Sequence, residues 1–107
     1  MKIAITSTGP NLDDLIDERF ARANYLIFAD TESTDFKAVK NEYAQGEHGV
    51  GPQTAQMVIN ENVETLITGN IGPNAARAIA AAKISIVMPR ERKTVREAIE
   101  DVKKGQE

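Results

Sequence analysis

The sequence contains a single histidine, His48, which lies in a glycine-rich stretch at residues 45–52 beside Glu47. A neutral imidazole is a good ligand for iron or zinc. One histidine cannot close a metal site, so His48 would add one ligand to a preformed cluster or complete a site shared across a dimer. A surface histidine in a mobile loop is the plainer interpretation, and for an isolated histidine it is the more common case.

A second candidate for chemistry is the glycine–proline segment that follows a short apolar run beginning at Val63. The run predicts a buried strand, Pro73 suits the first turn of a helix, and the alanine-rich stretch 75–82 favours that helix. Free N–H groups at the helix start would face the carboxyl edge of the sheet, where anions find donors and a favourable dipole. The residues that would form this binding site are Gly69, Asn70, Gly72 and Asn74. Such a turn is also common without a ligand.

Basic side chains could surround an anionic ligand at this edge. The candidates are Arg19, Arg22, Arg77, Arg90, Arg92, Lys93 and Arg96. Solvated surface charges, interleaved with Glu91 and Glu97, are the plainer interpretation of most of them. Arg19 and Arg22 are the hardest to dismiss, because they flank Phe20 just before an apolar strand.

Signals for catalysis are weak. Ser7, Ser33 and Ser85 could act as nucleophiles, but none lies in a G-x-S-x-G turn and only one histidine could serve as a base. The first strand carries no acid, which a two-metal nuclease of the RNase H-like type would need there. Neither a Walker A motif nor a full G-x-G-x-x-G is present. The residues therefore favour a binding protein over an enzyme, and an enzyme acting on a small phosphorylated molecule stays the alternative.

The composition is that of an ordinary soluble domain, with 107 residues, 41% hydrophobic and 27% charged residues, and a net charge of −3. One domain covering residues 1–107 is expected at this length. The mildly acidic balance argues against nucleic acid as a partner. Without cysteine, an apolar leader or a run long enough to span a membrane, the chain is expected to be cytoplasmic and free of disulfides.

Hydrophobic periodicity predicts alternating short elements. The predicted strands cover residues 2–7, 25–30, 36–43, the start of 63–82, and 84–88, and the predicted helices cover 53–62, 75–82 and a last segment after the Thr94/Glu97 capping box. Residues 12–22 are expected to form a loop with a short helical turn anchored by Phe20. This order implies a three-layer α/β/α fold with a mixed five-stranded sheet in the order 3-2-1-4-5, in which strand two is antiparallel.

Several of these segments resemble the dinitrogenase iron-molybdenum cofactor-binding family. Residues 17–23 are similar to its S-x-x-F-G-R-A segment, the His48-Gly49 pair to its His-Gly loop, residues 66–75 to its G-x-I-G-P-x-A segment, and 94–99 to its closing helix. The resemblance implies an RNase H-like fold without nuclease activity. It also implies a small stand-alone carrier of an iron-sulfur-type or iron-molybdenum cluster, related to nitrogen fixation and served by cluster-assembly proteins.

On this resemblance, His48 would hold the metal and Arg22 could balance the charge of the cluster. The alternative is an enzyme or a regulatory module that binds a small phosphorylated or anionic ligand at the same helix N-terminus. The lack of an evident general base counts against the enzyme.

Overall fold

The structure is a computed structural model that describes residues 1–47 and 50–105. Its elements, in chain order, are β1 (Lys2–Ser7), β2 (Tyr25–Asp30), β3 (Phe36–Lys40), α1 (Val50–Asn60), β4 (Thr65–Ile67), α2 (Pro73–Ala81), β5 (Ser85–Val87) and α3 (Val95–Gly105). None of the helices in these ranges has the length and hydrophobicity that a membrane span needs.

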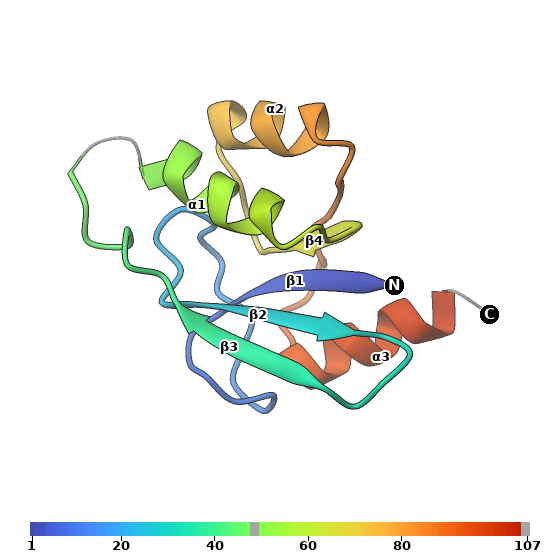
Figure 1. Cartoon of the computed structure of the whole chain (residues 1–107). Coiled ribbons are helices and arrows are strands. Elements are labelled where there is room, and N and C mark those ends of the chain that lie inside the picture. Colours follow the sequence, from blue (N-terminus) through green and yellow to red (C-terminus); the bar gives the residue numbers. More distant parts are fainter. Residues whose placement is uncertain (48–49, 106–107) are drawn as a thin grey trace.

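The strands form one mixed sheet in the order β3-β2-β1-β4-β5 (Figure 1). β2 is antiparallel to both β1 and β3, whereas β1, β4 and β5 are parallel. This is the predicted fold class, with β1 in the middle. It follows from chain connectivity, because a short polar turn can join only antiparallel neighbours whereas parallel strands need a helical crossover.

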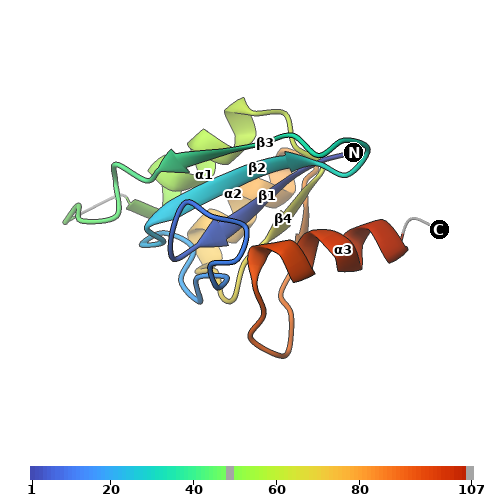
Figure 2. The ribbon, with the colours of Figure 1, turned by 90° about the horizontal axis from the view of Figure 1, so that it is seen from below.

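Helices cover both faces of the sheet, with α1 and α2 on one face and α3 on the other (Figures 1 and 2). Successive residues of β1 point to opposite faces. Ala4 packs in the cluster beneath α1 and α2, whereas Ile3 and Ile5 pack in the cluster against α3. Both faces of β1 are therefore buried, which explains why an almost continuous apolar run forms the central strand.

The structure differs from the sequence-based expectation in three places, two of which are element boundaries. The first helix begins at Val50 rather than at residue 53, because its first turn accommodates Gly51 and Pro52. The N–H groups of a first turn have no partner within the helix, so the N–H that proline lacks is not needed there. The third strand ends at Lys40 rather than at residue 43, because the buried amide of Asn41 turns inward to donate to two carbonyls, those of Ala21 and Ala23.

The third difference lies in residues 12–22, which form single hydrogen-bonded turns at their two ends, from the Asp14 N–H to the Asn11 carbonyl and from the Ala23 N–H to the Phe20 carbonyl, and no helix. This segment instead makes isolated bridges, Ser7 with Ile16 and Leu15 with Thr94. The expected anchor is confirmed, since Phe20 is almost fully buried in the cluster under α1 and α2. The second and third helices and the last strand match their predicted positions to within two residues.

The predicted capping box at the start of α3 is confirmed. The Thr94 N–H donates to the Glu97 carboxylate at 3.0 Å, and the Glu97 N–H donates to the Thr94 hydroxyl at 3.1 Å. The next donors are also used, because the N–H groups of Val95 and Arg96 donate to carbonyls of the 12–14 segment at 2.9 and 2.8 Å. Protein groups thus satisfy the N-terminus of α3.

Leu66→Ala should lower the free energy of unfolding by about 2–5 kcal/mol, because it leaves a cavity at a fully buried position on β4. Leu15→Ala, at a side chain that is 39% exposed, should cost about 1 kcal/mol or less. Urea unfolding of both variants measures the difference, and equal losses would contradict the burial assigned to Leu66.

The ion pair between Arg96 and Asp13 predicts a pH dependence. The hydrogen bond and charge of Arg96 hold the pKa of Asp13 below its usual value, so this pair stabilises the fold above about pH 4 and loses its effect as the pH falls through that lowered pKa. Asp13→Asn should therefore melt at a lower temperature than wild type near neutral pH and at the same temperature in strong acid. A gap between the melting temperatures that widens in acid would contradict this sign.

Candidate functional site

The carboxyl ends of β1 and β4 are joined beneath the candidate site by a buried polar network. The Thr6 hydroxyl donates to the carbonyl of Asp17 and is hydrogen-bonded to the hydroxyl of Thr68, both at 2.9 Å, and the Asp17 N–H donates back to the Thr6 carbonyl at 2.9 Å. The Gly69 N–H donates to the same Asp17 carbonyl at 3.3 Å. These bonds fix the 17–19 segment across the end of the sheet.

Gly69 is a glycine because the backbone of Glu18 lies directly on it. A Cβ at Gly69 would approach the Glu18 Cα to 2.5 Å, which no real side chain tolerates. Its N–H is already used by Asp17, so this donor is engaged within the protein. In this structure Gly69 is a packing contact between two loops.

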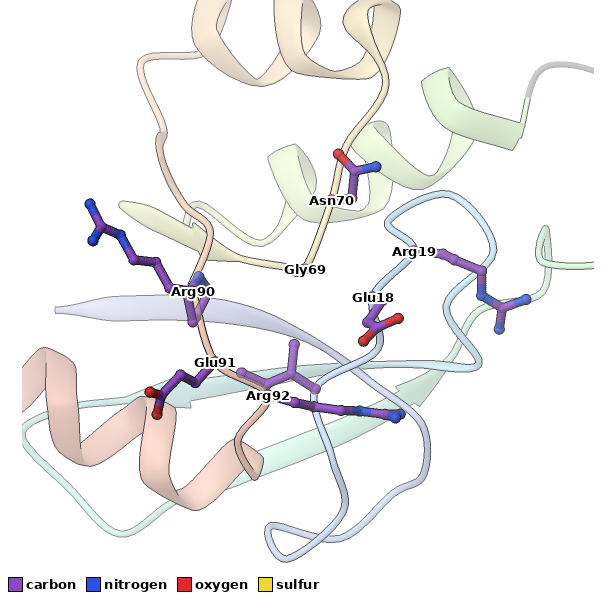
Figure 3. A pocket seen from close by; sticks show the side chains of 9 residues that line it. Glu18, Arg19, Gly69, Asn70, Arg90, Glu91 and Arg92 are labelled. Carbon is purple, nitrogen blue, oxygen red and sulfur yellow. The ribbon is translucent and has the colours of Figure 1, made fainter.

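A cavity of about 520 Å³ opens between the loops that follow the parallel strands (Figure 3). Its lining comes from three segments, and the residues are Ile16, Glu18, Arg19, Gly69, Asn70, Pro89, Arg90, Glu91 and Arg92. The volume falls in the range of small-molecule sites, about 300–1,000 Å³. We call this the edge cavity, since it sits where open α/β sheets bind ligands.

The arginines that line the edge cavity differ in whether they form ion pairs. Arg19 is held by Asp17, with its Nε 3.2 Å from Oδ1, and its guanidinium is directed away from Gly69 in Figure 3. The hydrogen bonds that Arg19 donates to the Asp17 carboxylate also raise the pKa of Arg19. Within the described ranges Arg90 and Arg92 form no ion pair. In Figure 3 Arg92 extends toward the side of Glu18, whereas the guanidinium of Arg90 is directed away from Gly69.

The N-terminus of α2 lies beyond Asn70 and, unlike that of α3, has no side-chain cap. Gly72 is the N-cap residue, with φ −74° and ψ 163°, and a Cβ built there would have nothing within 4 Å. The first turn of α1 lies alongside, since a Cβ at Gly51 would be 3.6 Å from that of Ala75. Two helix N-termini therefore meet at this edge of the sheet, which favours negative charge.

Some of the predicted site residues lie in the edge cavity or at the N-terminus of α2, and others lie in neither. His48 lies outside the described residues. Asn70 lines the edge cavity and its Oδ1 accepts the Ile71 N–H at 2.9 Å, whereas Asn74 is in the first turn of α2 and accepts from Arg77. Arg22 is outside the cavity lining, and its Nη1 donates to the Ala44 carbonyl at 3.0 Å.

Some of the candidate cations line the edge cavity, and others form ion pairs elsewhere. Arg19, Arg90 and Arg92 reach the edge cavity, whereas Lys93 pairs with Asp101 and Arg96 pairs with Asp13. Sequence reasoning missed the acidic members of the lining, Glu18 and Glu91, which it treated as solvated charges. The signal that could have found them is their position, because each adjoins a segment that crosses or follows a parallel strand at the same edge.

Direct metal ligands are scarce in the described part of the chain. No group of three or more His, Cys, Asp or Glu side chains is placed there to hold a metal ion. Arginines, amides and backbone donors instead suit an anion that carries its own ligands.

The fold is that of a small α/β protein with a mixed five-stranded sheet, and the edge cavity lies at the carboxyl ends of its parallel strands. The chain belongs to the dinitrogenase iron-molybdenum cofactor family, whose model matches residues 1–105. It is also similar to an uncharacterized protein of Methanocaldococcus jannaschii, with 31% identity over 78 residues. That match covers 70% of this chain and 63% of the archaeal protein.

Two solved structures are similar over nearly the whole chain. The apo form of the orange protein from Desulfovibrio gigas has 36% identity and a TM-score of 0.91, with 98% of this chain and 88% of that chain covered. A candidate NifB protein from Thermotoga, of the DUF35 family, has 39% identity and a TM-score of 0.83, with coverages of 98% and 89%. The chain is thus a cofactor-associated small protein by family.

The close contact at Gly69 predicts that Gly69→Ala destabilises the fold by about 1–3 kcal/mol, since either β4 or the 17–19 segment must move. Gly72→Ala is the matched control, with an open position and a φ that alanine adopts, and should cost about 0.5 kcal/mol. Urea unfolding of both variants tests this, and equal costs would show that the contact with Glu18 is not constraining.

Proposed function

We propose that this protein binds and carries an anionic metallocluster of the iron-sulfur or iron-molybdenum type, as cargo in cofactor assembly and without catalysing a reaction. The observation that supports this most is the edge cavity, whose lining includes Arg90 and Arg92, two cations that form no ion pair within the described residues. Family membership supports a metallocluster over other anions of this size. The partners would be the proteins that supply and receive the cluster, and the setting would be the cytoplasm.

The chemistry of the chain favours a cluster that arrives with its own ligands. There is no cysteine to supply thiolates, and the only histidine is His48. Sulfide and other ligands on the cluster would leave it negatively charged, and guanidinium groups with backbone N–H donors would hold that charge from outside. Arg90 and Arg92 are the side chains best placed to do so.

His48 is proposed as the one direct ligand. Val50 is two positions after His48, and two peptide units span at most about 7 Å between Cα atoms. Val50 and Gly51 open α1, beside Ala75 in the first turn of α2. Arg22 would act indirectly, because it fixes the Ala44 carbonyl in the segment that leads toward the histidine. Gly72 and Asn74 would contribute the donors and dipole of the open α2 N-terminus.

Reconstitution tests the proposal. Protein incubated under argon with ferrous iron, sulfide and tetrathiomolybdate should retain molybdenum and gain visible absorption after gel filtration, and retention should weaken in high salt. The double variant R90E/R92E should lose binding at least about tenfold, since two attractive charges become repulsive. The control K40E/K104E changes net charge equally at exposed positions outside the cavity lining and should bind as wild type.

Equal retention by both double variants would contradict a site in the edge cavity. Binding of inorganic phosphate with no retention of the cluster would favour the alternative, a module for small phosphorylated ligands.

His48→Ala separates ligation from electrostatic binding. If His48 ligates a metal of the cluster, the variant should shift the absorption bands and release the metal faster to a chelator, because one coordinate bond is lost. Unchanged spectra and release rates would remove His48 from the site while leaving the role of the arginines standing.

A further inference from the structure

The outer edge of β5 carries backbone groups that the sheet does not use. The Ser85 N–H donates to the Glu64 carbonyl at 3.0 Å, and the Val87 carbonyl accepts from the Thr68 N–H at 3.1 Å, so both residues face β4. Alternation turns the N–H and C=O of Ile86 to the opposite side. Within residues 1–47 and 50–105, no strand lies beyond β5.

The two edges of the sheet differ in how they are protected. The edge strand β3 carries exposed lysines, Lys37 and Lys40, which discourage pairing with another chain. β5 carries no charge, and the exposed side chains at its end are large and apolar, with Val87 43% and Met88 52% exposed. Only the β5 edge is therefore suited to accept a further strand.

An apolar groove of about 290 Å³ lies between β5 and α3. Its lining residues are Ile67, Val87, Pro89, Lys93, Ala98, Asp101 and Val102. The two charged members, Lys93 and Asp101, pair with each other, so the rest of the surface is left apolar. Val87 belongs both to the open edge and to this groove, and a strand added at the edge would therefore place side chains over it.

Charge indicates what kind of segment would fit. Residues 83–93, which contain β5 and its flanks, carry the cations Lys83, Arg90, Arg92 and Lys93 against the single acid Glu91, although the whole chain has a net charge of −3. Lys93 is paired with Asp101, and the other three cations still outnumber Glu91. A second copy of this strand would bring like charges together, whereas an acidic segment would be attracted.

We infer that β5 and the adjoining groove bind an extended segment of another protein, apolar at alternate positions and flanked by acidic residues, which adds a sixth strand to the sheet. Backbone bonds to Ile86 would give the pairing, and an apolar side chain in the groove would give specificity. Pro89 lines both this groove and the edge cavity, so the bound segment would lie beside the site proposed for the cargo.

The test uses the full chain and two synthetic peptides, each an alternating valine–threonine stretch, one with glutamates and one with lysines at both ends. Fluorescence anisotropy should show binding of the acidic peptide only, and amide hydrogen exchange at Ile86 should slow when it binds. Val87→Asn should weaken binding about tenfold, because an apolar contact in the groove is lost. Phe36→Asn, at a 42% exposed residue on the opposite edge strand, should leave binding unchanged.

Equal binding of the two peptides would overturn the charge argument, and equal effects of the two substitutions would overturn the location. Sedimentation velocity of the free protein provides a further check. A dimer that dissociates in Val87→Asn would show that a second copy, and not an acidic partner, occupies this edge.

Discussion

The structure of the candidate site depends on one contact, the passage of the Asp17–Glu18 backbone over Gly69. The carbonyl of Asp17 accepts from both the Gly69 N–H and the Thr6 hydroxyl, so a single oxygen ties the long β1–β2 loop to the two central parallel strands. The missing side chain at Gly69 allows this approach. Because the loop is fixed here, Glu18 and Arg19 form a wall of the edge cavity instead of folding away from it.

The helix N-termini differ in whether protein groups already use their N–H donors. The first N–H groups of α3 are used by its capping box and by carbonyls of the 12–14 segment, so that end is closed to ligands. α2 begins at an exposed glycine without a side-chain cap, and the first turn of α1 lies beside it. An anion is therefore favoured on the α1–α2 side and at the arginines of the edge cavity, where the protein has left donors and charges uncommitted.

The fold was largely predictable, because hydrophobic patterning, helix capping and turn residues all favour the same elements. The apolar run of β1, the Thr94/Glu97 capping box and the polar turn before β3 agree with one another and with the observed strand order. The start of α1 was missed because Gly51 and Pro52 resemble loop residues although a first turn accommodates both. The candidate site was only partly predictable. Its glycines predict a turn. Which basic side chains are left without an ion pair depends on tertiary contacts, such as those of Arg96 with Asp13 and of Lys93 with Asp101.

The central claim is that the cargo sits in the edge cavity. Anomalous diffraction from crystals loaded under argon with the molybdenum–iron–sulfide mixture measures this directly. The account predicts metal peaks bounded by Asn70, Arg90 and Arg92, close to the start of α2. Peaks in the groove between β5 and α3, or only at scattered surface carboxylates, would contradict it.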